Sequence, residues 1–574
     1  MNKEDSNDEI ESDYQGEEDL DEIETSKDHA VDNYRLGGRK PLITILVLMG
    51  GPVMLQVCGA LYGIISTMWV SKAVGNIGVT AISAYSTFDN IGRAFGFFLS
   101  VSASTKVSQL FGMGKHEEAN QVVTDLLRMC VVCGALVPAI LLPIVNICCR
   151  WFGCDDEVVG LGFKYLCPIL SCSVLTCIYV LDNGLLQGEG RTLLVGIISV
   201  CTLCASMFIF ETLFLFAFKT GIVGAGVATV LGDTLPAIGL TVCYFLGKFS
   251  VKPHLSGFIK KFSPHTLPAM KVGLSQLVAN LSMSVPGIVM RKLIGASCTE
   301  EQFNPAMAGY NMVFRYAMIT NCVVIAVSMG YIPAASYAYA SKRYKRFLRL
   351  TFHALWISQV WSLITNIPTW VCPREICKIF GSDPDYLSYA GPMVNKGNML
   401  QFISYFRIIT QGCLQALQLG GQAMIITFCT QLLAIIVFAF VLYYTNKHDP
   451  VRLCWCYPIS YALGLVMGSL MLIKPLRNVY RLYKEHELEK IEKKELSDIN
   501  KCSQSNMANS DDTNSLALIQ TNEDGKAQDS NVRNRNASSL EDEYTASEST
   551  SINRLRTKND EYESDKESKK VDEF

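Results

Sequence analysis

Long apolar stretches alternate with short polar ones through the middle of this chain. Runs such as 130–149 and 424–444 are long enough to cross a bilayer, which takes about 20 residues of helix. They are continuously apolar, and backbone groups must be paired inside lipid, so we expect helices rather than barrel strands. Twelve spans are predicted, the second and tenth being the weakest because they contain charges: 43–68, 80–105, 122–147, 159–181, 192–217, 222–246, 266–292, 307–333, 348–372, 387–411, 422–445 and 451–474.

The two ends of the chain differ from this middle. Residues 1–34 carry 14 Asp and Glu against two Lys, which is the opposite of a basic secretion leader and too polar to fold alone. A charged helix is predicted over 477–494, and disorder beyond about Asn500. The predicted organisation of this all-α membrane protein has five parts: an acidic disordered tail (1–40), a first six-span lobe (41–247), a cytoplasmic linker (248–265), a second six-span lobe (266–475) and a C-terminal charged helix with a disordered tail (476–574).

Lysine and arginine gather in alternate loops. One side of the predicted membrane carries 39–40, 342–349 and 477–484, whereas the other includes the acidic stretch 155–157. The positive-inside rule places both termini and the basic loops in the cytoplasm, and an even number of spans agrees. The basic loops are expected to face anionic lipid of the plasma membrane or an organelle membrane, and no nucleic-acid partner is expected.

The chain repeats itself at a fixed distance. Gly184, Leu186 and Gln187 recur as Gly412, Leu414 and Gln415, and the offset is the same for all three. A long-period repeat in an apolar chain is typical of a duplicated transporter. Because each copy contains six spans, both enter the membrane from the same side. We therefore expect two lobes related by an axis along the membrane normal.

Three segments resemble the multidrug and toxic compound extrusion (MATE) family, in that family's order: 109–119 (QLFGMGKHEEA), 186–190 (LQGEG) and 221–229 (GIVGAGVAT). The resemblance covers roughly 41–475. It implies twelve helices in two V-shaped lobes, and export of organic, often cationic, compounds driven by H⁺ or Na⁺. It thus implies a transporter rather than an enzyme, with a small organic substrate, a coupling cation and no cofactor, and we expect a monomer.

Glu211 is the first candidate for the coupling site. An ionisable group inside a span costs roughly 2.5–3.5 kcal/mol on insertion scales, and no basic residue lies within one turn of this one. Burial disfavours a charged carboxylate, so Glu211 could exchange protons near physiological pH. The alternative is a glutamic acid satisfied by a hydrogen bond to another helix. In the resembling family this place usually holds Asp.

Asn183 and Asp89 complete the predicted cation-coupling set. Asn183 matches a family Asn near the cation site, although a helix-end cap is the alternative, and its neighbour Asp182 is expected at the membrane interface. Asp89 and Arg93 lie four residues apart on one helix face, as an ion pair that either braces the first lobe or lines the central cavity.

The second lobe carries amides but no acid in the middle of a span. Asn280, Asn321 and Asn395 are predicted, with Asp89 and Arg93, to line the substrate cavity. The family commonly has an Asp late in the first span, where this chain has Ser66. This departure removes one carboxylate from the inferred cation site, so coupling is expected in the first lobe through Glu211.

Two alternatives remain. A lipid-linked saccharide flippase has similar duplicated lobes and a more cationic cavity, which Arg315, Lys396 and Arg407 would supply along with Arg93. A membrane enzyme would need paired catalytic carboxylates or clustered His, but the seven His are scattered singly. Neither a metal site nor an ATP-binding loop is expected.

Overall fold

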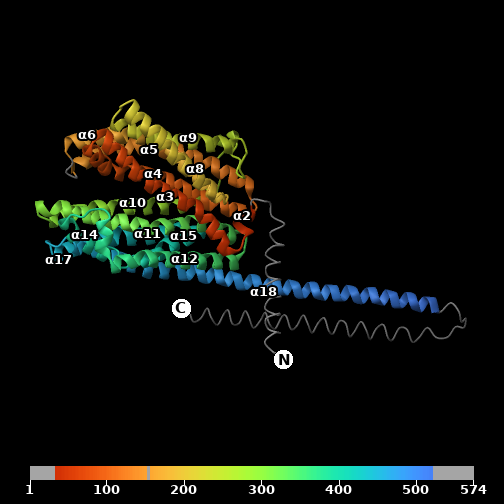
Figure 1. The fold of residues 1–574 in the computed structure, drawn as a ribbon. Helices are drawn as coiled ribbons and strands as arrows, with labels where there is room; N and C mark the ends of the chain where they lie inside the picture. The colour runs from red at the N-terminus through yellow and green to blue at the C-terminus, as the bar shows by residue number, and fades with distance from the viewer. Residues whose placement is uncertain (1–32, 152–154, 521–574) are drawn as a thin grey trace. The chain divides into compact units, whose positions relative to one another are not determined.

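The structure is a computed structural model that describes residues 33–151 and 155–520. Most of these residues are helical (Figure 1). The first helix set consists of α2 (Asn33–Gly37), α3 (Pro41–Val74), α4 (Asn76–Gly112), α5 (His116–Trp151), α6 (Asp156–Ser171), α7 (Ser173–Gly188), α8 (Thr192–Cys204), η1 (Ala205–Glu211), η2 (Leu213–Ala217) and α9 (Ile222–Phe245). A linker containing η3 (Leu255–Phe258) leads to the second helix set.

The second helix set repeats the order of the first. It consists of α10 (Thr266–Ser297), α11 (Glu300–Ala340), α12 (Tyr344–Val371), α13 (Pro373–Lys378), α14 (Pro384–Gly397), η4 (Gln401–Ile403), α15 (Ser404–Ala416), α16 (Gly420–Thr427), η5 (Phe428–Leu433), α17 (Ala434–Thr445), η6 (Arg452–Trp455) and α18 (Cys456–Gln520). In Figure 1 the first set, red to yellow, lies above the second, green to blue.

Eight of the described helical segments are long and apolar enough to cross a membrane. A ninth span results if α6 and α7, which meet at an angle of 58°, are counted as one. α12 is not among them, and its sequence explains why: Ser358, Ser362, Asn366 and Thr369 form a fully buried polar stripe. Such a stripe lowers the hydropathy of a helix whose other face, with Phe352, Val360 and Ile364, is apolar and exposed.

Several predicted spans are interrupted in the structure. The fourth breaks at Cys172, between α6 and α7, and the tenth breaks between Gly397 and Ser404. The fifth contains the π-helical turns η1 and η2, and the eleventh contains η5. π-Helical turns inside α-helices occur frequently at functional sites.

The backbone confirms the internal repeat. Gly114 and Lys342, which the offset of the repeat makes equivalent, both have positive φ, at 72° and 60°. Gly190 and Gln418, equivalent by the same offset, have φ of 74° and 62°. Equivalent hydrogen bonds close both pairs of turns. In the first pair, Lys115 N–H donates to Leu110 O and Arg343 N–H donates to Ala338 O, each at 2.9 Å. In the second pair, Arg191 N–H donates to Leu186 O and Leu419 N–H donates to Leu414 O, each at 2.8 Å.

The packing of the two sets differs between the ends of the bundle. One hydrophobic core joins residues of both sets, among them Leu48, Leu110 and Tyr337, whereas three further cores are each built from one set only. At the shared end the backbones approach closely. A Cβ on Gly112 would lie 2.7 Å from Tyr337 O, and one on Gly330 would lie 2.8 Å from Met49 N. The sets are therefore closed against each other at this end.

Two expectations for the polar segments need correction. Residues 33–40 do not form part of a disordered tail, because α2 is helical and Leu36 is fully buried against the second set. α18 also extends past Asn500 to Gln520. Asp182, whose place at the membrane interface stays a prediction, is 1% exposed, and its carboxylate accepts a hydrogen bond from Thr241 at 3.0 Å. The disorder predicted for 1–32 and 521–574 lies outside the described residues.

Contacts divide the chain into a unit ending at His486 and a second unit beginning at Glu487. The first contains the whole first helix set and the second set as far as His486 of α18. The described part of the second, 487–520, is helical. The candidate site lies in the first unit.

Candidate functional site

A network of charges lies inside the first helix set. On α4, Arg93 contacts Asp89 one turn earlier at 3.3 Å, as the sequence predicted, and it also contacts Asp233 on α9 at 3.0 Å. The side chains of Arg93, Asp89 and Asp233 are 24%, 21% and 12% exposed. The guanidinium thus bridges two spans, and each charge of this group has an opposite charge within reach.

Glu211 stands apart from this network as a fully buried carboxyl group. It ends the π-helical turn η1, and neither of its carboxylate oxygens has a hydrogen-bond partner of regular geometry among the described residues. The hydroxyl groups of Ser66 and Tyr62 on α3 lie close enough to this carboxyl group for hydrogen bonds of less regular geometry. The structure therefore brings together Glu211 and Ser66, the residue that takes the place of the family's first-span Asp.

Two tyrosines connect Glu211 with the charge network. Tyr62 donates to or accepts from Thr229 at 2.7 Å, and it lies within electrostatic reach of Glu211 and Arg93. Tyr165 on α6 lies within reach of the same two groups. Three carboxyl groups and one guanidinium thus form one polar region inside the first set. Because the carboxyl groups outnumber the guanidinium, this region is suited to a cation.

Asn183 lies at the edge of this region. Its Oδ1 is buried without a hydrogen-bond partner in the described parts of the chain, and the residue is in contact with Tyr179, which lies within reach of Asp233. An unpaired buried amide oxygen can accept a hydrogen bond or ligate a cation. The alternative role as a helix cap does not apply, because Asn183 lies inside α7.

The three predicted amides of the second set are not joined to this region by any hydrogen bond between described residues. Asn280 Nδ2 on α10 and Asn321 Oδ1 on α11 are likewise buried without a described partner. Asn395 donates to Thr369 O at 2.9 Å, between α14 and α12. By the repeat, Asn321 occupies the place of Arg93, and Tyr461 that of Asp233. The second set thus lacks the charges of the first at these places.

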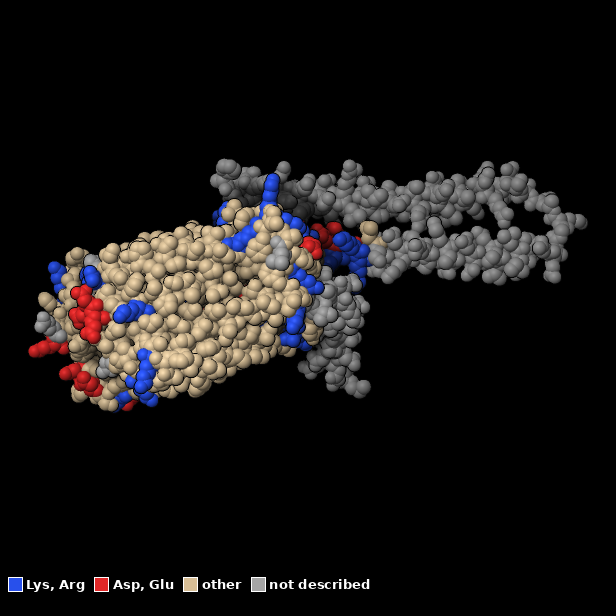
Figure 2. All heavy atoms as spheres, turned by 90° about the horizontal axis from the view of Figure 1, so that it is seen from above, with Lys and Arg blue, Asp and Glu red and all other residues tan. Residues whose placement is uncertain are grey.

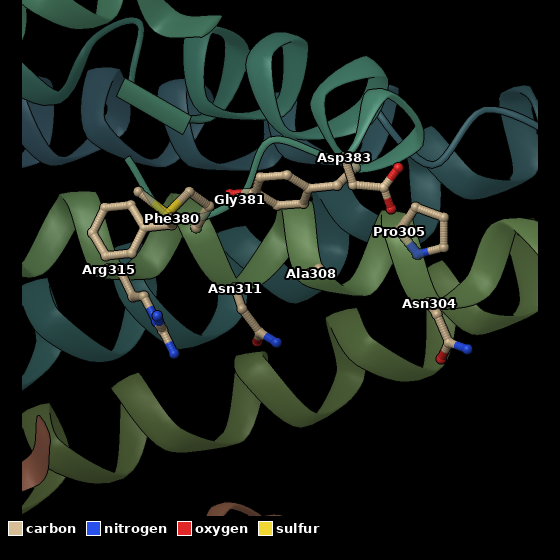
Figure 3. A pocket seen from close by; sticks show the side chains of 10 residues that line it. Asn304, Pro305, Ala308, Asn311, Arg315, Phe380, Gly381 and Asp383 are labelled. Atoms are coloured by element: carbon tan, nitrogen blue, oxygen red, sulfur yellow. The ribbon is translucent and has the colours of Figure 1, made fainter. Parts of the chain in front are cut away.

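A cavity of about 430 Å³ lies in the second set, between α11 and the segment around Phe380 (Figure 3). Asn304, Asn311 and Arg315 project from one side of α11. The guanidinium carbon of Arg315 lies 5.8 Å from the centre of the Phe380 ring. Arg315 forms no salt bridge with a described residue, so this cavity offers a cation and an aromatic ring to a ligand.

Asp233 was not among the site residues predicted from the sequence. Its position could have indicated it, because an aspartate in the middle of the sixth span costs as much free energy to bury as Glu211 does. The pairing of Asp233 with Arg93 could not be predicted from the sequence, since the two residues lie four spans apart. Within 33–151 and 155–520, no group of three His, Cys, Asp or Glu side chains could hold a metal ion.

The family model MatE matches this sequence twice, over residues 52–213 and 279–441. The two matches together cover more than half of the chain. The second match follows the first at the offset of the internal repeat, so each copy of the repeat matches the model once.

Known proteins similar to this chain fall into two groups. Among curated relatives, "Multidrug export protein MepA" from Staphylococcus haemolyticus is 22% identical over 382 residues, covering 65% of this chain and 81% of the relative. MepA from Staphylococcus saprophyticus is 20% identical over 384 residues, with the same coverage.

Solved structures show the same fold. One is described as an outward-facing conformation of a multidrug resistance MATE family transporter of the MOP superfamily, with a TM-score of 0.72 and 17% identity, covering 79% of this chain and 99% of the other. A MOP superfamily transporter from Pyrococcus furiosus, described as having reversed polarity in its binding pocket, gives 0.71, 17% identity and the same coverage.

Proposed function

The chain belongs to the MatE family, and on this premise we propose that it is a secondary active antiporter. It exports organic, mainly cationic, compounds in exchange for H⁺ or Na⁺, with H⁺ preferred. The relatives named above are multidrug export proteins, which supports efflux as the direction of transport. As an all-α membrane transporter of this family, the protein is not an enzyme.

The proposed architecture has twelve spans in two six-helix lobes, related by an axis along the membrane normal, with both termini in the cytoplasm. The interrupted helices α6–α7 and α14–η4–α15 each count as one span. The basic residues of 342–349 lie at the end where both sets share one core, and the positive-inside rule assigns that end to the cytoplasm. The conformation is then closed to the cytoplasm.

One observation carries the proposal: Glu211 is a fully buried carboxyl group without a salt bridge to any described residue. A buried charge without a partner is costly, so a proton or a metal cation would stabilise this group. A proton needs only one acceptor oxygen, whereas Na⁺ needs several ligands. Within the described part of the first set's polar region, the other buried oxygens without a hydrogen bond are Asn183 Oδ1 and Asp233 Oδ2, and Arg93 already holds the latter at 3.0 Å, so few ligands remain for Na⁺ and H⁺ is favoured.

The proposed cycle uses the π-helical turns beside this group. Protonation of Glu211 from the outside removes its charge and changes its interaction with Tyr62 and Ser66 on α3. The turns η1 and η2 can then return to regular α-helical pairing, which alters the packing of α3 and the shape of the cavity. The organic cation is released outward, and the proton leaves to the cytoplasm after the lobes reorient.

The test is transport by purified protein in liposomes. Uptake of a fluorescent organic cation is measured under separately imposed proton and sodium gradients. We expect the proton gradient to drive uptake by the wild-type protein and Glu211→Gln to abolish it, because the amide cannot release a proton. Glu117→Gln, which removes an exposed carboxylate, is the control and should transport normally. Full gradient-driven transport by Glu211→Gln would rule out this coupling site.

The alternative is a lipid-linked saccharide flippase, which one feature of the second set favours. Arg407 is 9% exposed, lies beside Tyr461, and forms no salt bridge with a described residue. An unpaired cation of this kind suits a diphosphate group. Arg93 no longer supports this function, because Asp89 and Asp233 neutralise it. Movement of a fluorescent lipid-linked saccharide without any response to proton or sodium gradients would favour the flippase.

A further inference from the structure

The linker between the two helix sets carries unusually exposed apolar side chains. It joins α9 and α10, both of which are apolar enough to span a membrane, so it lies at a membrane surface. Ile259 is 92% exposed, Phe262 55% and Phe258 39%. Contiguous large apolar side chains on a water-facing surface mark an interaction site. We call residues 258–262, which also include Lys260 and Lys261, the linker patch.

The linker patch is held rigidly by the first helix set. Arg128 on α5 donates to Lys260 O at 2.9 Å and also to Gly257 O. Its guanidinium carbon lies 5.8 Å from the ring centre of Phe258 and 5.3 Å from that of Phe262. One arginine thus fixes both the backbone and the aromatic rings of the patch.

Two buried acids fix the linker on either side of the patch. The carboxylate of Asp125, fully buried, accepts bonds from Ser263 N–H and Thr266 Oγ–H, both at 2.8 Å. The carboxylate of Glu189, 1% exposed, accepts from Val251 N–H at 3.0 Å. The exposure of Ile259 and Phe262 is therefore a fixed feature of the fold and does not come from a loose loop.

The charge of the patch complements an anionic surface. Lys260 and Lys261 are exposed and form no salt bridge with any described residue. Figure 2 shows Lys and Arg gathered near the ends of the molecule, with a broad band of other residues between. Aromatic and aliphatic side chains next to lysines are typical of segments that lie in the lipid headgroup region.

We propose that the linker patch is a membrane anchor that binds anionic phospholipid. Ile259 and Phe262 insert among the lipids at the membrane surface, and Lys260 and Lys261 bind the negatively charged headgroups. The clamps at Arg128, Asp125 and Glu189 transmit this attachment to the first helix set. The inference goes beyond the proposed function, since it holds whichever compound and ion are transported.

Lipid retention tests the anchor. Purified protein is mixed with phosphatidylserine and phosphatidylcholine, and the lipids that stay bound are counted by native mass spectrometry. We expect phosphatidylserine to be retained preferentially, and Lys260→Gln/Lys261→Gln to lower this retention roughly fivefold or more, because each lysine near an anionic surface contributes separately.

The matched control is Lys248→Gln/Lys252→Gln. It removes the same charge from exposed positions earlier in the same linker, outside the linker patch. It should retain phosphatidylserine like the wild-type protein. Equal losses in the two double variants, or no loss in either, would overturn the proposal.

Hydroxyl-radical labelling tests the insertion separately. In nanodiscs containing phosphatidylserine, we expect the peptide with Ile259 and Phe262 to be labelled less than in nanodiscs of phosphatidylcholine alone. Lys260→Gln/Lys261→Gln should raise its labelling in the first kind of nanodisc. Strong labelling in both kinds by wild-type protein would show that these side chains face water.

Discussion

At the residue scale, the candidate site divides its charges between two tasks. Arg93 is held between Asp89 and Asp233 on two helices, which braces the first helix set. Glu211 is left without a counter-charge among the described residues. Because Arg93 pairs with the carboxylates of Asp89 and Asp233, Glu211 is the carboxyl group whose protonation, in the proposed cycle, responds to a proton gradient.

Asp233→Asn tests the bracing role. Removing one partner of a buried ion pair costs roughly 3–5 kcal/mol, and here Asp89 remains to offset part of that loss. We expect a lower apparent melting temperature in detergent, measured by intrinsic fluorescence. The double variant Asp233→Asn/Arg93→Gln should lose less than the sum of the two single variants, because the charges removed belong to one pair. Additive losses would contradict the bridge between α4 and α9.

Individual site residues were predictable where the energetic cost of an ionisable group inside a span was enough to identify them. Glu211 and the pair Asp89–Arg93 followed from the expense of charges in a span, and Asp233 could have followed in the same way. The partner of Arg93 depends on how α4 packs against α9, which a single sequence does not contain. The burial of Asp182 depends likewise on Thr241 of another helix.

At the element scale, the two copies of the repeat form the same turns with different residues. Glycine occupies the left-handed positions of the first copy, at Gly114 and Gly190, where it is favoured. The second copy has Lys342 and Gln418 at these positions. Both polar atoms of the Gln418 amide are buried without a hydrogen-bond partner in the described chain. The second copy therefore carries strain that the first does not.

Gln418→Gly should relieve this strain. A non-glycine residue in the left-handed region costs roughly 1–2 kcal/mol, and the added flexibility of glycine in the unfolded chain offsets part of the gain. We expect a net stabilisation of about 0.5–1 kcal/mol, seen as a higher apparent melting temperature. Gln418→Ala also removes the buried amide but keeps the strained backbone, so it should stabilise less than Gln418→Gly. The opposite order would contradict the strain.

Most elements were predictable, and each exception has its own cause. Twelve apolar or partly apolar stretches and the internal repeat are properties of the sequence itself. The break at Cys172 leaves no comparable signal, because no Gly or Pro lies at it, whereas the break at 398–403 follows Gly397 and begins at Asn398, two turn-forming residues that the predicted tenth span did not take into account. α2 was predicted as part of a disordered tail because its order comes from the second helix set, far along the chain.

At the scale of the whole molecule, the duplication provides a symmetric frame with asymmetric charge. The first set holds three carboxyl groups and one guanidinium in its polar region, whereas the equivalent places in the second hold Ala317, Asn321, Ala439 and Tyr461. In the proposed cycle, movement between the sets is therefore coupled to events in the first. It must also break the contacts that close the sets against each other at the shared core.

Arg346 on α12 makes the most concentrated of these contacts. It is 2% exposed, and its guanidinium donates to Leu36 O at 3.1 Å, to Thr44 Oγ1 at 2.9 Å and to Arg39 O at 2.6 Å. Its neighbour Arg343 donates to Gly37 O at 3.1 Å. The second set thus binds the start of the first mainly through main-chain oxygens, and this end cannot open unless these bonds break.

Arg346→Ala should therefore favour separation of the sets at this end. We expect faster amide hydrogen exchange in 33–44, where the accepting oxygens lie, and in 110–115, where the sets touch. Arg346→Lys should rescue only part of the protection, because a single ammonium cannot replace a planar fork of donors. Arg349→Ala, which removes an exposed arginine one turn along the same helix, should leave exchange unchanged. If Arg346→Ala exchanged like Arg349→Ala, these bonds would not hold the sets closed, and the closure would rest on the hydrophobic core alone.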